Sequence, residues 1–237
     1  MRKTLPAFVP AHAKLLLNFI GDTEAPEGYD TIFGNRQDRL PVRLTMMTYG
    51  DIVDAQANWN NKGWVKRHWG FLTASSAAGR YQFMRATLIG IAQEIPTLSG
   101  NMLFDADLQD KLGYHLLLRR GYDKFVAGDM SIAAFGKALA QEWASFPVLA
   151  ACKGAHRDLR RGQSYYAGDG LNKALVKPER VEAVLRQVLA VVDAEPLAPL
   201  PKPPTAAPAP QPVPAAKPSI RVILAQLLAK LFGGRRA

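Results

Sequence analysis

The feature that most limits how this chain can fold is a cluster of prolines near its C-terminal end. Ten of the 17 prolines lie between Ala194 and Pro218, among alanines and with little charge. Proline has no backbone N–H and fixes its own φ angle, so this stretch is predicted to be an extended, semi-rigid linker rather than packed structure. The sequence therefore divides into a globular domain over residues 1–193, a Pro/Ala-rich linker over residues 194–218 and a C-terminal segment over residues 219–237.

The C-terminal segment, Ser219 to Ala237, has the pattern of a basic amphipathic helix. Its apolar residues recur at helical spacing, and it contains four basic residues and no acidic residue. The apolar run is shorter than the roughly 20 residues that span a bilayer. We expect this helix to lie on an anionic membrane surface, with docking on a protein partner or on the globular domain as the alternatives.

Residues 1–193 have mostly helical periodicity. Thr48 with Asp51 has the pattern of a capping box, and Asp105 can cap a later helix. The expected helices cover residues 11–21, 49–59, 83–95, 106–120, 131–143 and 178–193. Residues 28–44 lack this periodicity, and within them residues 29–35 predict a short strand and turn. The predicted fold class is α+β, mostly α, with a small β-hairpin region.

Composition and motif searches exclude several classes of function. The single cysteine, Cys152, cannot form an intrachain disulfide, and the four histidines are scattered. No glycine-rich phosphate loop is present, so we expect neither a metal nor a cofactor. The formal charge of +10 favours anionic partners, but residues 1–193 carry 24 basic against 19 acidic residues, so half of the excess lies in the tail. The sequence has no nucleic-acid-binding motif, so we expect no binding to nucleic acid. We also expect the protein to be a monomer.

The strongest candidate for chemistry is Glu24, which lies just past the first expected helix and before the predicted hairpin. A helix end that faces a small sheet forms a cleft, and a carboxyl group there can be desolvated. Desolvation raises the pKa and leaves a proton to donate near neutral pH. Glu27 is the nearby alternative, but Pro26 turns the chain away before it. A single glutamate in a loop is also typical of a solvated surface acid.

Three short motifs follow Glu24 in order: Gly28–Gly34, Ala78–Gln82 and Trp143–Pro147. Together with the glutamate they resemble the lambda-type phage endolysins, lysozyme-fold enzymes that cleave peptidoglycan glycan strands. The resemblance covers roughly residues 11–190. It implies a lysozyme-like fold in which Glu24 is the catalytic acid that cleaves the β-1,4 bond between N-acetylmuramic acid and N-acetylglucosamine. Residues 36–73 and 162–170 are longer than in the lambda protein, so the cleft subsites are expected to differ.

The motifs also supply candidate substrate-binding residues. The tyrosine and glutamine side chains can stack on a sugar or donate amide hydrogen bonds to it, and the serine can hydrogen-bond a hydroxyl. The same side chains also suit the buried start of a helix, and the arginine suits a structural ion pair. The candidates are Tyr29, Arg80, Tyr81, Gln82 and Ser145.

Two reaction types remain open from the sequence. A hydrolysing lysozyme usually needs two carboxylates, and Asp30, Asp38 and Asp51 are candidate partners that spacing alone cannot place. A lytic transglycosylase can use one glutamate, which protonates the bridging oxygen and then accepts a proton from the 6-hydroxyl of the sugar. The resemblance implies this single-acid route. The alternative of another class is a non-catalytic peptidoglycan-binding or virion structural protein.

The N-terminal residues do not have the pattern of a secretory signal peptide. Pro6 and Pro10 interrupt the first apolar stretch, and the stronger apolar run lies after the would-be cleavage site at Ala13. The resemblance then implies synthesis in the bacterial cytoplasm and action on the cell wall in the periplasm. The amphipathic pattern of residues 219–237 separately predicts peripheral membrane association.

Overall fold

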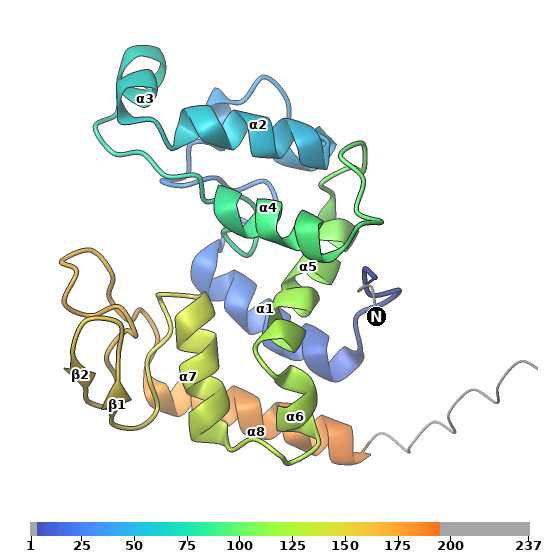
Figure 1. Ribbon diagram of the computed structural model, residues 1–237, viewed down its shortest axis with the longest axis vertical. Coiled ribbons are helices and arrows are strands. Elements are labelled where there is room, and N and C mark those ends of the chain that lie inside the picture. The colour runs from blue at the N-terminus through green and yellow to red at the C-terminus, as the bar shows by residue number, and fades with distance from the viewer. Residues whose placement is uncertain (1–3, 195–237) are drawn as a thin grey trace, which may run out of the picture. The chain divides into compact units, whose positions relative to one another are not determined.

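The computed structural model describes residues 4–194. The predicted linker beyond Ala194 and the predicted C-terminal helix at residues 219–237 lie outside the described residues. The described part contains eight α-helices, two short 3₁₀ helices and one two-stranded sheet (Figure 1). In chain order these are α1 (Ala11–Glu24), η1 (Gln37–Arg39), η2 (Leu44–Met46), α2 (Tyr49–Trp59), α3 (Lys62–Trp69), α4 (Arg85–Glu94), α5 (Ala106–Arg119), α6 (Tyr122–Val126), α7 (Ile132–Glu142), β1 (Cys152–Lys153), β2 (Asp158–Leu159) and α8 (Pro178–Ala194).

The helices of residues 4–194 form two groups, with α1 and α5 between them (Figure 1). The first group contains α2, α3 and α4, and the second contains α6, α7 and α8 with the β1–β2 hairpin beside α7. Helix α1 packs on both α5 and α8, and α7 packs on α8. Fully buried side chains such as Leu17, Leu112, Leu139 and Leu185 fill the core where these helices meet. Helix α1 thus has its C-terminal end close to both groups.

Local capping explains where several of these helices begin. Thr48 and Asp51 form the predicted capping box at the start of α2. The Asp105 carboxylate accepts a hydrogen bond of 2.8 Å from Leu108 N at the start of α5, and Ser131 caps α7 in the same way at 3.2 Å. Each of the six predicted helices is present, with boundaries that differ by at most three residues. The prediction of a mostly helical α+β protein is confirmed.

Two short helices were not predicted. Helix α3 covers the basic and aromatic stretch Lys62–Trp69. Asn61 caps it and Gly70, with φ +78°, ends it. Its Trp64 and Trp69 rings pack edge to face with centroids 5.1 Å apart, and Trp69 also contacts Trp59 of α2. The tryptophans of α3 therefore pack against the protein itself.

Of the short strand and turn predicted at residues 29–35, the turn is present, with Asn35 N donating to Ile32 O at 3.0 Å, but the strand is reduced to a single bridge. Ile32 forms an isolated antiparallel bridge with Ala78, and Ala78 also bridges Phe83. The chain then enters the 3₁₀ helices η1 and η2. The β-hairpin of the described chain instead joins β1 and β2, where Cys152 pairs with Leu159. Within residues 4–194, no helix combines the length and the apolar composition of a membrane span.

Candidate active site

Glu24 is the last residue of α1 rather than the first residue of a loop. Ala25 N donates to Gly21 O at 2.8 Å and closes the final turn, and Pro26 has no N–H with which to continue the helix. The Glu24 carboxyl accepts a hydrogen bond from the Ser145 hydroxyl, which follows α7. The fold therefore brings together two predicted site residues that lie 121 positions apart in the chain.

The surroundings of Glu24 favour its protonated form. Burial raises the pKa of Glu24 above its ordinary value of 4.5, and the hydrogen bond from Ser145 lowers it by less. Among the described residues, no basic side chain lies within ion-pair distance of this carboxyl. Arg80, on the turn that packs against α1, is instead paired with Asp22 at 2.7 Å. A largely buried carboxyl without a cationic partner keeps its proton to higher pH, as a general acid must.

Glu24 lines a pocket of about 410 Å³, which is within the usual size range of small-ligand sites. One part of its wall comes from the segments that precede α4. The other part comes from the end of α7 and from the loop that follows β2. The lining residues are Glu24, Phe33, Ala77, Gln82, Met84, Glu142, Trp143, Ala144, Tyr166 and Asn172. The pocket thus lies between segments that are widely separated in sequence.

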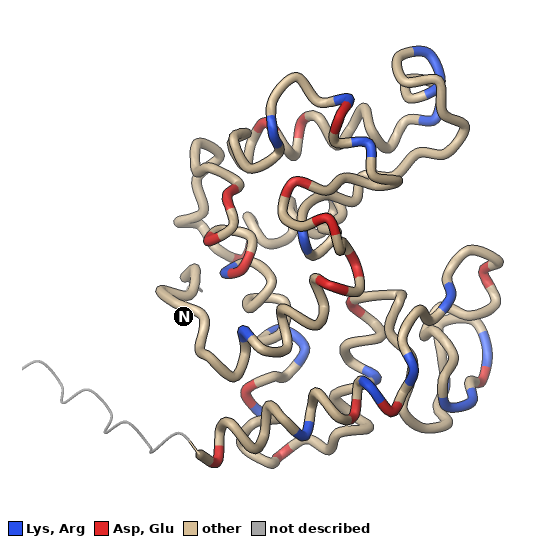
Figure 2. The backbone as a smooth tube through the Cα atoms, turned by 180° about the vertical axis from the view of Figure 1, so that it is seen from behind, with Lys and Arg blue, Asp and Glu red and all other residues tan. Residues whose placement is uncertain are grey.

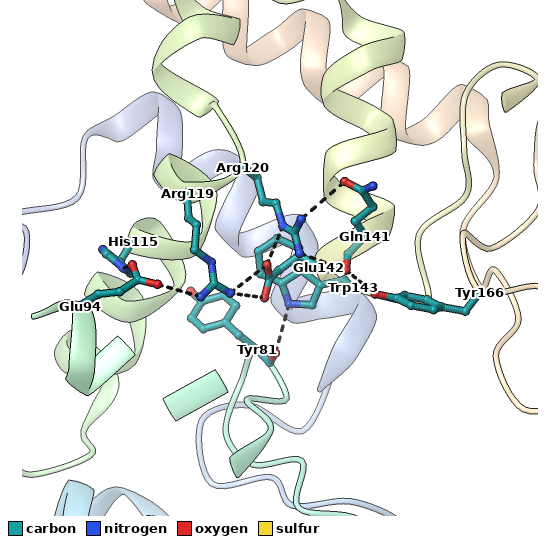
Figure 3. A network of polar contacts seen from close by, with 9 residues as sticks. All are labelled: Tyr81, Glu94, His115, Arg119, Arg120, Gln141, Glu142, Trp143 and Tyr166. Carbon is teal, nitrogen blue, oxygen red and sulfur yellow. Dashed lines mark hydrogen bonds and ion pairs between the residues drawn. The ribbon is translucent and has the colours of Figure 1, made fainter. Parts of the chain in front are cut away.

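Glu142, which no sequence pattern indicated as a site residue, is a second carboxylate among the lining residues. Its side chain is only 7% exposed and is contacted by two arginines, Arg120 at 2.7 Å and Arg119 at 3.1 Å (Figure 3). Arg119 also reaches Glu94 at 3.4 Å, and Glu94 contacts His115 at 3.0 Å. The negative charge of Glu142 is therefore compensated by a network that joins α4, α5 and α7.

The same network fixes the backbone at the end of α7. Trp143 Nε1 donates to Tyr81 O at 3.2 Å, and Tyr166 OH donates to Gln141 O at 2.7 Å (Figure 3). Ser145, which holds the Glu24 carboxyl, lies two residues beyond Trp143. These contacts therefore position the serine.

The five predicted substrate-binding residues divide into two groups. Gln82 lines the pocket, and its φ of +47° lies in a region that favours glycine. Ser145 contacts Glu24. Tyr29, Arg80 and Tyr81 do not line the pocket, so their predicted role as direct sugar contacts is not supported by the geometry.

The reason is that these three side chains are used inside the protein. The hydroxyl of Tyr81, which is 1% exposed, and the hydroxyl of Tyr29 both donate to the buried Asp110 carboxylate, the latter at 2.9 Å. Lys14 also contacts Asp110. Arg80 packs over the Tyr29 ring, with its guanidinium carbon 5.3 Å from the ring centroid. The Ala78–Gln82 motif thus forms a structural turn, from which Gln82 alone lines the pocket.

The three aspartates considered as partners of Glu24 do not line the pocket. Asp30 is paired with Arg43 and accepts a hydrogen bond of 2.9 Å from Thr45 N. Asp51 belongs to the capping box of α2. Asp38 is 69% exposed and lies beside Arg39. The structure therefore gives two of these carboxylates structural roles and leaves the third in solvent.

Comparisons with known proteins add nothing to this geometry. No protein-family model, curated protein or solved structure matches the chain. Within residues 4–194, no group of three or more His, Cys, Asp or Glu side chains is placed to hold a metal ion.

Proposed function

We propose that this protein is an endolysin-type enzyme with a lysozyme-like fold. Its reaction would be cleavage of the β-1,4 bond between N-acetylmuramic acid and N-acetylglucosamine in peptidoglycan. The observation that carries the proposal is the Glu24 carboxyl, which lines a pocket, is largely buried and has a raised pKa with a neutral hydroxyl as its partner. The choice of peptidoglycan as substrate comes from the motif resemblance, and the geometry supports the role of Glu24 as the acid.

In the proposed reaction, Glu24 donates its proton to the bridging oxygen as the glycosidic bond breaks. The Ser145 hydroxyl donates to Oε1 of Glu24, which leaves Oε2 to carry the proton. The resulting carboxylate then accepts the proton of the 6-hydroxyl on the muramic sugar, whose oxygen closes a 1,6-anhydro ring. Glu24 is thus first acid and then base, as general acid–base catalysis permits.

The geometry favours this single-acid route over hydrolysis. Hydrolytic enzymes of this class usually need a second carboxylate as nucleophile or base. Glu142 is the other carboxylate that lines the pocket, but Arg119 and Arg120 bind it. A carboxylate that forms two ion pairs is a poor nucleophile for a sugar carbon.

Exposed apolar side chains at the pocket fit a sugar ring. Phe33 is 37% exposed and Met84 is 42% exposed, and both line the pocket. Partly exposed aromatic and thioether groups offer apolar faces on which the C–H face of a pyranose can pack. Gln82 places an amide in the same wall, where it can meet hydroxyl or N-acetyl groups.

The test is Glu24→Gln, with Glu27→Gln as the matched control because Glu27 is an exposed neighbour. We expect Glu24→Gln to lower the rate on purified sacculi by at least about 100-fold, the usual loss when a general acid is removed. Glu27→Gln should retain the wild-type rate. Mass spectrometry of the released fragments should show 1,6-anhydromuramic ends.

The outcomes separate the competing functions. Reducing muramic ends as the main product would replace transglycosylation with hydrolysis. A wild-type protein that binds sacculi but releases no fragments would indicate a non-catalytic binding protein. Loss of activity in Glu27→Gln but not in Glu24→Gln would overturn the assignment of the acid.

A further inference from the structure

A second pocket, of about 460 Å³, adjoins the Glu24 pocket, because Asn172 lines both. Its wall is formed by the end of the β1–β2 hairpin and by the loop that leads to α8. The function proposed above uses none of this wall. Arg157 and Lys173 both line it, and no aspartate or glutamate does.

The charge of this region is unusually one-sided. Residues 151–177 contain six Lys and Arg and two Asp, a net +4, whereas residues 1–193 together have a net +5 (Figure 2). Among the described residues, neither Arg157 nor Lys173 forms an ion pair, while nearby Arg161 is paired with Glu179 and Glu182. Two cations without ionic partners beside one pocket favour an anionic ligand.

The loop that carries Lys173 is held in shape by its own acid. The Asp169 carboxylate accepts hydrogen bonds from Leu171 N and Asn172 N, both at 2.9 Å, and from the Asn172 amide at 2.6 Å. Gly168 and Gly170, with φ of +116° and +75°, supply the turns that this conformation needs. The Asp169 carboxylate therefore accepts its hydrogen bonds from its own loop.

The same loop is attached to the segment that holds the catalytic acid. Ser164 Oγ donates to Ala144 O at 2.7 Å, and Leu175 N donates to Ser145 O at 2.7 Å. Because Ser145 contacts Glu24, these hydrogen bonds hold the cationic pocket at a fixed position relative to the acid. A group bound in this pocket could therefore be attached to a sugar that occupies the Glu24 pocket.

We propose that the Arg157–Lys173 pocket binds the carboxylates of the peptide attached to N-acetylmuramic acid. This inference rests on the proposed function. The scissile bond joins muramic acid to its neighbour, so the peptide on the lactyl group must leave the cleft close to Glu24. That peptide ends in free carboxylates, and guanidinium and ammonium groups bind carboxylates directly. The pocket therefore selects glycan strands that still carry acidic peptides.

The test combines charge removal on the protein with charge removal on the substrate. The full-length wild type and the double variant Arg157→Gln/Lys173→Gln are assayed on soluble peptide-bearing glycan strands and on the same strands with their peptide carboxylates converted to amides. We expect the double variant to lose about tenfold in kcat/KM on native strands, mainly through KM, since the lost contacts are exposed ionic contacts that solvent weakens. On amidated strands the two proteins should be equal.

The matched control is Lys153→Gln, which removes an exposed charge from β1 outside the pocket and should behave as wild type on both substrates. An equal loss on native and amidated strands, or no loss on either, would overturn the inference. Should the double variant not fold, the wild type alone decides the inference, because it must prefer native over amidated strands by a similar factor. Failure of the proposed function is a separate result, in which the wild type cleaves neither substrate faster than Glu24→Gln.

Discussion

Glu142→Gln removes one negative charge from a side chain that two arginines contact and that is only 7% exposed. The amide keeps the shape of the carboxylate and can still accept hydrogen bonds, but Arg119 and Arg120 lose their common counter-ion. If Glu142 is structural, the variant should lose stability and retain chemistry. If it is a second catalytic carboxylate, the variant should lose chemistry.

The expected loss of stability follows from the exposure of the three groups. Breaking a fully buried ion pair costs about 3–5 kcal/mol. Here the two arginines are 29% and 30% exposed, and Arg119 retains its contact with Glu94, so solvent and a second partner offset part of the cost. We therefore expect a fall of about 2–3 kcal/mol in the free energy of unfolding, which corresponds to roughly 5–10 °C in Tm for a domain of this size.

Urea unfolding followed by circular dichroism measures the free energy of unfolding, and fragment release from sacculi measures the catalytic rate. The control is Glu179→Gln, whose side chain is 69% exposed in its pair with Arg161 and whose loss should leave the free energy of unfolding close to that of the wild type. At a temperature where it is fully folded, Glu142→Gln should keep its rate within about threefold of wild type, well short of the 100-fold loss of a catalytic base. A 100-fold slower variant with wild-type stability would refute this reasoning and support hydrolysis.

Two further substitutions test the surroundings of Glu24. Gly21→Ala would bring its new Cβ into a clash with the Arg80 side chain, so the arginine must move, and we expect the free energy of unfolding in urea to fall by about 1–3 kcal/mol. In Gly90→Ala, the new Cβ on α4 would meet nothing within 4 Å apart from its neighbours in the helix, so the change should be neutral or stabilising. An equal loss in both variants would contradict the packing argument. Ser145→Ala removes the hydrogen bond that lowers the pKa of Glu24, so the alkaline fall in the pH–rate profile should move to higher pH. A fall that moves to lower pH would show that the profile reports another group.

Sequence patterns predicted the elements that short-range interactions determine. The capping residues Thr48, Asp105 and Ser131 act within three residues of their own positions, so the helices that they begin could be located from the sequence. Helices α3 and α6 are eight and five residues long, too short for periodicity to distinguish them from loops. The β1–β2 hairpin has two residues per strand and offers no alternating pattern at all.

Glu24 could be singled out because a carboxyl at a helix end beside a cleft suits proton donation, and because the three motifs that follow it strengthen this signal. The structure places Glu24 in the wall of a pocket, and its catalytic role stays a prediction. Glu142 could not be singled out, because its place beside Glu24 depends on the packing of α7 against other helices. Its one sequence signal is that it immediately precedes the Trp143–Pro147 motif. Tyr81 shows the opposite error, because a motif residue near a cleft was taken as a ligand contact although its side chain is buried.

A basic protein must keep its cations away from an acid that has to remain protonated. A guanidinium close to Glu24 would lower the pKa of that carboxyl. The side chain of Arg80 packs against Gly21, one turn before Glu24, but its guanidinium forms an ion pair with Asp22. Arg119 and Arg120 form ion pairs with Glu142 in the same way.

Asp22 and Glu142 are thus paired with the arginines of this region. Burial is the main influence on the pKa of Glu24, and burial raises that pKa. Arg157 and Lys173, which have no such partners among the described residues, line the adjoining pocket, where a positive charge can attract substrate. In the proposed reaction, this arrangement would separate binding of an anionic strand from protonation of its glycosidic oxygen in a molecule with a net positive charge.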